Sequence, residues 1–176
     1  TPEWYWEIRW QAAEALRGSL KVIEEVDSEY GRRFGRRYGL FSTYRTEDAE
    51  MVMVAYGSVY GLAKKVVDRL RGEGVKAGAL RLRVIRPWPG DLLRKALEGA
   101  DKVLVLDRTI NHGAYLQGPM AMEVAATLQR PVYSALATIG MRAIDSDMIY
   151  EAALKVWKGL WAPNQTYTIG LRGGYE

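Results

Sequence analysis

The chain has 176 residues and a net charge of +4, with 25 Lys and Arg against 21 Asp and Glu, one histidine and no cysteine. The lack of cysteine excludes disulfides, cysteine-ligated iron–sulfur clusters and thiolate zinc sites, and the single His112 excludes a multi-histidine metal site. No apolar run reaches the roughly 20 residues that cross a bilayer, so we expect no transmembrane helix and no membrane contact. The first residues alternate aromatic and charged types without the apolar core of a signal peptide, so we expect a cytoplasmic protein.

The first 34 residues have the apolar spacing of an amphipathic helix. Its apolar positions are Trp6, Trp10, Ala13, Leu16, Leu20, Ile23, Tyr30 and Phe34. Gly18 and Ser19 leave open whether the segment is one long helix or two. Trp4, Trp6 and Trp10 belong to an aromatic run too dense for one buried stripe, so we predict either a core contact or a partner interface.

Arginines are concentrated around the end of this predicted helix, with no acidic residue between the first of them and Glu47. They are Arg32, Arg33, Arg36, Arg37 and Arg45. One interpretation is a helix C-terminus whose cations complement the helix dipole, and the other is a docking patch for an acidic partner. Elsewhere basic and acidic residues alternate, and +4 is modest for this length, so nucleic acid is not the expected partner.

Residues 38–160 alternate short apolar runs with helical patterns, which is typical of an α/β fold with a mostly parallel sheet. Strands are predicted over residues 38–44, 51–55, 79–85, 102–107 and 131–136. The short link after residue 44 permits the first strand to run antiparallel. Helices are predicted after Ser58, after Asp91, and over residues 119–129 and 146–160. We expect Asp91 to cap one helix, and Asp145 or Ser146 to cap the last.

The character of the chain changes after residue 160. Residues 161–176 are neither periodic nor strongly charged, and we interpret them as an extended arm. The predicted organisation is therefore a helical extension over residues 1–37, an α/β domain over residues 38–160 and a C-terminal arm over residues 161–176.

Ligands of open parallel sheets bind at the carboxyl ends of the strands, where the strand order reverses. Gly57 and Ser58 follow one predicted strand, while Asp107 ends another and Arg108 follows it. These four residues form a candidate crevice for an anion, although Gly57 lacks the glycine spacing of a nucleotide loop. The structural alternative is that Gly57 permits a tight turn, Ser58 caps the next helix, and the other two pair at an interface.

Three residues outside this crevice complete the candidates. Ile139 and Gly140 follow the last predicted strand. His112, which stands in a loop, is either a general base or a structural hydrogen-bonding group. None of these sets amounts to a self-sufficient active site.

Several motifs follow one another along the chain. They are YRTEDAE at residues 44–50 followed by MVMVAYGS, KVLVLDR at residues 102–108, and a loop ahead of GPM at residues 118–120. Together they resemble the C-terminal region of the alpha subunit of pyruvate:ferredoxin oxidoreductase and related 2-oxoacid:ferredoxin oxidoreductases. EWYWEIRW at residues 3–10 is similar to the connector that precedes this region in pyruvate-type members.

The resemblance implies a transketolase C-terminal-like domain. This is a three-layer α/β/α fold with a five-stranded, mostly parallel sheet whose first strand is antiparallel. The implied reaction converts pyruvate, coenzyme A and oxidised ferredoxin to acetyl-coenzyme A, carbon dioxide and reduced ferredoxin. The chain lacks the family's signature for thiamine diphosphate and Mg²⁺, and it has no cysteine for [4Fe–4S] clusters. The resemblance therefore places these cofactors elsewhere in the complex and assigns no catalytic, cofactor-binding or metal-binding residue here.

By resemblance, the chain is a noncatalytic assembly domain of this enzyme. Its implied partners are the remaining alpha-subunit domain and the thiamine-binding, gamma and ferredoxin-like subunits, with ferredoxin and coenzyme A reached through the complex. The candidate interface is Trp4, Trp6, Trp10, Arg32, Arg33, Arg36 and Arg37. Two alternatives stay open. One is the same domain of a 2-oxoisovalerate, 2-oxoglutarate or other thiamine-dependent enzyme, and the other is a stand-alone α/β module that binds an anionic ligand at Gly57 and Arg108.

Overall fold

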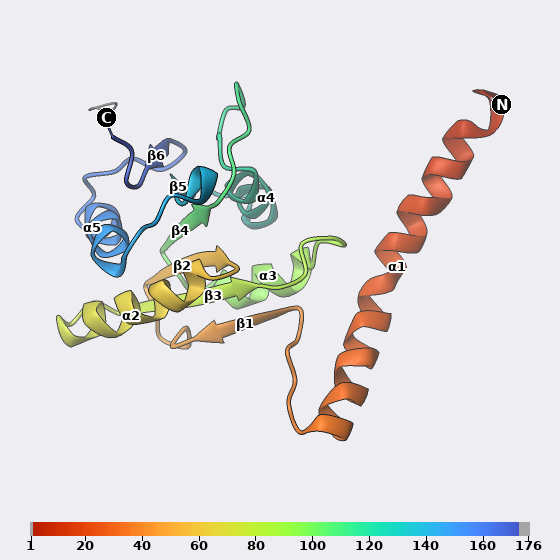
Figure 1. The fold of residues 1–176 in the computed structure, drawn as a ribbon, viewed down its shortest axis with the longest axis horizontal. Coiled ribbons are helices and arrows are strands. Elements are labelled where there is room, and N and C mark those ends of the chain that lie inside the picture. The colour runs from red at the N-terminus through yellow and green to blue at the C-terminus, as the bar shows by residue number, and fades with distance from the viewer. Residues whose placement is uncertain (1, 173–176) are drawn as a thin grey trace.

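A long helix stands apart from an α/β body in the computed structural model, which describes residues 2–172 (Figure 1). The helix, α1 (Pro2–Phe34), has 33 residues, none of which is buried. It is continuous through Gly18, so the first segment is one helix and not two. Among the described residues, no helix combines the length and the apolar character that crossing a membrane requires.

The C-terminal end of α1 is attached to the segment that follows it through Asp27. The Asp27 carboxylate accepts the backbone N–H of Tyr38 at 2.7 Å and a guanidinium N–H of Arg37 at 3.2 Å. The N–H groups of Tyr38 and Gly39 hold the pKa of Asp27 below its usual value, and Arg37 adds to this effect. The Tyr30 and Tyr38 rings pack with their centroids 5.9 Å apart. The chain therefore turns back along α1 before it enters the sheet.

Six strands form one sheet in the order β1-β3-β2-β4-β5-β6. They are β1 (Phe41–Tyr44), β2 (Met51–Tyr56), β3 (Ala77–Leu82), β4 (Lys102–Asp107), β5 (Tyr133–Leu136) and β6 (Thr166–Thr168). β1 runs antiparallel to β3, and the other neighbouring pairs are parallel. The mostly parallel sheet with a reversed first strand is thus confirmed, but the expected number of five strands is wrong because β6 was not predicted.

β6 lies in the segment that we interpreted as an extended arm. Its three residues pair in parallel with β5 at the edge of the sheet. The rings of Trp161 and Tyr167 stack with centroids 4.1 Å apart, and the Tyr167 hydroxyl accepts the N–H of Ala162 at 2.8 Å. A strand of three residues, two of them threonine, has no apolar alternation, so no periodic pattern predicts it.

Four helices cover the two faces of the sheet in pairs. α2 (Val59–Gly72) and α5 (Ser146–Trp157) pack on one face, and α3 (Gly90–Leu97) and α4 (Pro119–Leu128) pack on the other. A short 3₁₀ turn, η1 (Ile139–Met141), precedes α5. Met53 and Leu104 on the central strands face α2 and α5, whereas Val54 and Val105 face α3 and α4. The central strands are therefore buried on both faces, as their continuous apolar sequences predict, and the three-layer architecture is confirmed.

The helix starts agree only in part with the expected caps. Asp145 accepts the N–H of Met148 at 2.9 Å and caps α5, as predicted. Asp91 does not cap α3, because this helix begins at Gly90 and Asp91 already lies inside its first turn. Ser58 makes no capping bond to α2, since its backbone is helical (φ −71°, ψ −25°) and an N-cap residue needs an extended backbone. These two predictions are wrong.

Candidate functional site

The strand order reverses between β2 and β4. From β2 the chain passes to β3 on one side, and then to β4 on the other side of β2. Open α/β sheets bind ligands at such a point, at the carboxyl ends of the strands. Gly57 and Ser58 follow β2 there, and Asp107 ends β4 with Arg108 next to it. The candidate crevice predicted from the sequence therefore falls at the topological switch point.

Gly57 and Arg108 are brought together at this point. A Cβ atom on Gly57 would lie 2.8 Å from Arg108 Nη1, so any other residue at position 57 would displace the guanidinium from its present position. Gly57 also has φ +65°, a conformation that other residues rarely adopt. The backbone N–H of Arg108 donates to the Tyr56 hydroxyl at 2.9 Å, and Arg108 Nε donates to Thr138 Oγ1 at 3.1 Å. Arg108 is thus held at the switch point by contacts with Tyr56 at the end of β2, with Gly57 after β2, and with Thr138 after β5.

A pocket of about 280 Å³ adjoins this contact. Its lining residues are Tyr56, Gly57, Arg81, Leu82, Arg83 and Ile85. Arg81 and Arg83 are not among the predicted site residues, because their alternation with Leu80, Leu82 and Val84 is typical of the polar face of a strand. The signal that identifies them is their place at the carboxyl end of the strand that neighbours β2.

Asp107 serves a different purpose from Arg108. Its side chain is fully buried and accepts the N–H groups of Met120 and Ala121, each at 3.0 Å, in the first turn of α4. Burial raises the pKa of this carboxyl to about 6, while the hydrogen bonds from Ala121 and Met120 act in the opposite direction. Asp107 therefore joins the end of β4 to the start of α4, and it contacts α4, not the pocket beside Gly57.

The GPM motif is explained by this joint. A Cβ atom on Gly118 would overlap the Asp107 carboxylate, so glycine is required where α4 begins. Pro119 follows as the first residue of the helix, a position that needs no backbone N–H. Two of the motifs that carry the family resemblance are therefore parts of one structural contact between Asp107 and α4.

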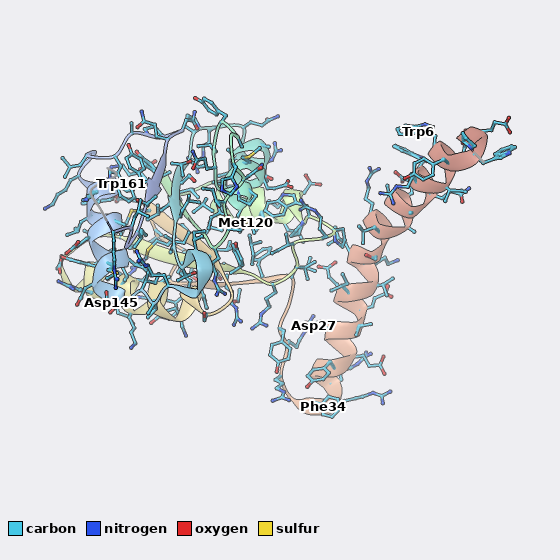
Figure 2. The ribbon with its side chains drawn as sticks, turned by 45° about the horizontal axis from the view of Figure 1, so that its top comes forward. Trp6, Asp27, Phe34, Met120, Asp145 and Trp161 are labelled. Atoms are coloured by element: carbon cyan, nitrogen blue, oxygen red, sulfur yellow. The ribbon has the colours of Figure 1, made fainter. Side chains whose placement is uncertain are left out.

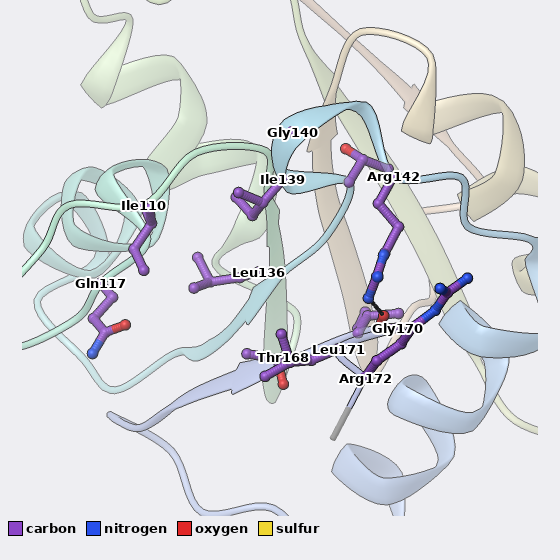
Figure 3. Close-up of a pocket in the computed structure, with 12 residues that line it drawn as sticks. Ile110, Gln117, Leu136, Ile139, Gly140, Arg142, Thr168, Gly170, Leu171 and Arg172 are labelled. Atoms are coloured by element: carbon purple, nitrogen blue, oxygen red, sulfur yellow. Dashed lines mark hydrogen bonds between the residues drawn. The ribbon is translucent and has the colours of Figure 1, made fainter. Parts of the chain in front are cut away.

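A second pocket, of about 630 Å³, lies beyond the carboxyl ends of β5 and β6 (Figure 3). Ile139 and Gly140, the strand-end residues expected from the sequence, are on its wall, with Leu136, Thr168 and Leu171 among the others. Arg142 also lines it, but its guanidinium donates to the Gly170 carbonyl. The lining is mostly apolar and brings no acid and base together.

The other predicted residues lie on the surface. His112 is exposed in the loop between β4 and α4 and makes no side-chain hydrogen bond within residues 2–172. Trp4, Trp6 and Trp10 are each more than half exposed on α1. Figure 2 shows Trp6 near the free end of this helix, away from the body.

The arginines at the end of α1 are mostly turned toward their own helix. Arg33 pairs with Glu29, Arg36 donates to the Tyr30 hydroxyl at 3.0 Å, and Arg37 pairs with Asp27. Arg32 forms no ion pair within residues 2–172. The interpretation as helix C-terminal cations therefore accounts for the contacts of three of these side chains.

The chain has relatives whose identity is known. Residues 49–149 match the family model of the pyruvate:ferredoxin oxidoreductase core domain II. Pyruvate synthase subunit PorA of Thermotoga maritima is 39% identical over 176 residues, which cover 97% of this chain and 44% of that protein. The chain thus spans less than half the length of the curated relatives it matches.

Two solved structures share the fold. One is 2-oxoglutarate:ferredoxin oxidoreductase from Magnetococcus marinus, with a TM-score of 0.56, 20% identity, and coverage of 72% of this chain and 21% of that one. The other is a split gene transketolase, with a TM-score of 0.56, 16% identity, and coverage of 70% and 43%. The transketolase-like fold is confirmed, and the matched domain shows that this chain belongs to the pyruvate:ferredoxin oxidoreductase family.

Proposed function

We propose that this chain is a noncatalytic assembly domain of a pyruvate:ferredoxin oxidoreductase. The complex would convert pyruvate, coenzyme A and oxidised ferredoxin to acetyl-coenzyme A, carbon dioxide and reduced ferredoxin. The observation that carries the proposal is α1, which has 33 residues and buries none of them. Large exposed apolar patches on a protein mark surfaces that a partner covers. In this proposal residues 1–37 form the docking extension and residues 38–160 the α/β domain, whose sheet is completed by β6 from the segment 161–176.

Large apolar side chains lie on opposite sides of the first turns of α1, with Glu3, Glu7 and Arg9 between them. Successive residues of an α-helix are rotated by about 100°, so Trp4 and Ile8 lie on one side while Trp6 and Trp10 lie on the opposite side. All four side chains are more than half exposed. Exposed aromatic side chains on two sides of a helix are typical of a surface that a partner covers. We therefore expect this end of α1 to insert between elements of a partner.

Further along α1, the two sides of the helix differ. Val22 and Val26 continue the side of Trp4 and Ile8, and both are exposed. The ion pairs of Arg17 with Glu14 and of Lys21 with Glu25 lie beside this side of the helix. The pair of Arg33 with Glu29 lies on the same side and ends the apolar stretch. The apolar side therefore offers a partner a continuous stripe along α1, bordered by paired charges.

The length of the relatives supports a partner from the same enzyme. The matched segment is only 44% of the Thermotoga maritima PorA subunit, so such subunits contain more sequence than this chain provides. We propose that α1 docks on the remaining alpha-subunit domain. The thiamine-binding, gamma and ferredoxin-like subunits then complete a cytoplasmic complex, through which ferredoxin and coenzyme A are reached.

The cofactors of the family do not fit the residues of this chain. [4Fe–4S] clusters require cysteine thiolates, and the sequence has none. Within residues 2–172, no group of three or more His, Cys, Asp or Glu side chains is placed to hold a metal ion such as Mg²⁺. We therefore assign thiamine diphosphate, Mg²⁺ and the clusters to other parts of the complex, and no catalytic step to this chain.

The test is co-purification of the tagged chain with the remaining subunits. We expect the wild-type chain to retain them, and Trp6→Ser with Trp10→Ser to lose most of this binding while the body stays folded. Tyr115→Ser is the matched control, because Tyr115 is an aromatic residue 84% exposed on the body. Stoichiometric binding of thiamine diphosphate by the isolated chain would contradict the proposal, and so would equal retention by the tryptophan variant.

The same domain of a 2-oxoisovalerate or 2-oxoglutarate oxidoreductase is the second candidate. The fold alone does not choose between them, since the Magnetococcus marinus neighbour with this fold is a 2-oxoglutarate enzyme. The assembled complex should be assayed with each of the three oxoacids. The highest kcat/KM with pyruvate would support the first assignment, and a preference for another oxoacid would replace it.

A further inference from the structure

Three arginines at the carboxyl ends of the sheet have no acidic partner. Arg81 and Arg83 stand at the end of β3, and Arg108 follows β4. None of the three forms an ion pair within residues 2–172, whereas Arg45 and Arg71, at the opposite end of the parallel strands, are paired with Asp68 and Asp48. Positive charge is therefore left unbalanced around Gly57.

Arg81 carries the clearest sign of a missing partner. It lies on β3 opposite Ala55 of β2, and its guanidinium is 5.8 Å from the centre of the Tyr60 ring on α2. Its Nε atom is buried and has no hydrogen-bond acceptor among the described residues. Buried donors of this kind are nearly always satisfied, by protein, water or a bound ion. An anion that reaches Arg81 would supply the acceptor.

The start of α2 adds positive electrostatic potential around Gly57. α2 has 14 residues, no acidic residue in its first turn and no side-chain cap at Ser58. The N-terminus of such a helix presents free N–H groups and the positive end of the helix dipole. Gly57, which only Ser58 separates from α2, has no side chain that would keep a ligand away from the backbone.

A pocket of about 280 Å³ lies against Gly57, Arg81 and Arg83. The Arg108 guanidinium does not line it but adjoins Gly57 at its edge. None of its lining residues, all within the described part of the chain, is acidic. We propose that this pocket binds the phosphate group of a small anionic ligand, with Arg81 and Arg108 holding its charge. Guanidinium groups suit this task because they donate paired hydrogen bonds to phosphate oxygens. The site is distinct from the assembly surface of α1.

Binding can be measured on the full chain with inorganic phosphate as the probe, by NMR titration and by thermal unfolding against sodium chloride of equal ionic strength. We expect phosphate to raise Tm above the chloride control, as a ligand of the folded state does. Arg81→Met and Arg108→Met should each weaken the apparent Kd by at least about tenfold. Arg94→Gln, which removes one exposed positive charge on α3, should change it by less than about twofold.

The Arg81→Met variant also shows whether weaker phosphate binding is caused by unfolding of the protein. Because Arg81 Nε has no partner, the ligand-free Tm of this variant should equal or exceed that of the wild type. Unchanged phosphate affinity in Arg81→Met would overturn the proposal, as would wild-type protein that responds to phosphate and chloride alike up to about 20 mM. A parallel titration with glycerol 3-phosphate identifies the source of the phosphate group. Tighter binding than inorganic phosphate indicates a phosphomonoester, and weaker binding indicates the free ion.

Discussion

α1 and the α/β body follow the same amphipathic rules but reach opposite results. In the body, apolar side chains of the strands and helices meet and are removed from water, as Met53 and Leu104 are. In α1, side chains of the same kind, such as Trp6 and Leu16, remain exposed. The apolar pattern of a sequence therefore predicts which face of a helix or strand is suited to burial. It does not predict whether the same chain or a partner buries that face. This difference is the observation that supports the proposal that another protein covers α1.

The largest expected effect is on the free energy of unfolding, and it comes from comparing a Leu→Ala substitution in the α/β body with one in α1. Leu104→Ala, in the buried centre of β4, should lower the free energy of unfolding by about 2–5 kcal/mol, because it leaves a cavity in a close-packed core. Leu16→Ala, at a position of α1 that is 47% exposed, should change it by less than about 0.5 kcal/mol. Urea denaturation followed by circular dichroism measures both. Comparable losses would mean that α1 is part of the cooperative core.

Asp107 tests the electrostatics of the body. Burial raises its folded-state pKa from 3.8 to about 6, so protonation stabilises the folded state and ionisation opposes it. Stability from this group is full below about pH 4 and is lost as the pH rises through about 6, by at most about 3 kcal/mol. Asp107→Asn cannot ionise, so its free energy of unfolding should lack this decline. Parallel slopes for the two proteins between pH 4 and 7 would refute the assignment.

β6 tests where the body ends. Tyr167→Ala removes the stacking on Trp161 and the bond to the N–H of Ala162, and it should cost about 1–2 kcal/mol. Tyr167→Phe keeps the ring and should lose only the smaller share that is due to the hydroxyl. A negligible change in both variants would show that the C-terminal segment behaves as a free arm and does not belong to the sheet.

The smallest expected effect concerns the attachment of α1. The pKa of Asp27 is lowered, chiefly by the N–H groups of Tyr38 and Gly39, so its contribution is present at neutral pH and is lost as the pH falls through its folded-state pKa. Asp27→Asn should therefore loosen the angle between helix and body with little change in stability. Because the chain has no cysteine, single cysteines introduced at positions 16 on α1 and 98 on the body can be spin-labelled specifically. The distance between the two labels then reports the angle between helix and body.

The distance distribution between the two labels should broaden in Asp27→Asn. Glu29→Gln is the control, because it removes only the exposed pair with Arg33 on the same helix. An unchanged distribution in Asp27→Asn would show that the packing of Tyr30 on Tyr38 is sufficient to orient α1.

The sequence predicted what depends on local periodicity. The strand predicted over residues 102–107 has the same bounds as β4. Its continuous apolar run predicts burial on both faces, and the structure buries it on both faces. The strand predicted over residues 79–85 instead ends at Leu82, because the N–H groups of Arg83 and Val84 both bond to the Leu40 carbonyl. That contact joins segments more than 40 positions apart, and no local pattern contains it.

The candidate site divides in the same way. Gly57 and Arg108 could each be placed at the carboxyl end of a predicted strand, and the structure shows that they meet at the switch point. Asp107 could not be separated from Arg108 by sequence, because adjacent residues at the end of a strand point to opposite faces and so meet different helices. Arg81 lies beside the pocket only because β3 pairs with β2, and such strand pairing is tertiary structure that no local sequence pattern contains.

The edges of the sheet limit how this protein can associate. β1 and β6, the two outer strands, have only four and three residues, and the outer side of each offers few backbone groups for pairing with another chain. Addition of strands from a neighbour is therefore unfavourable at both ends. Contacts with other proteins are directed to side-chain surfaces instead, which favours an assembly of defined size over the open-ended growth that long, unprotected edge strands allow.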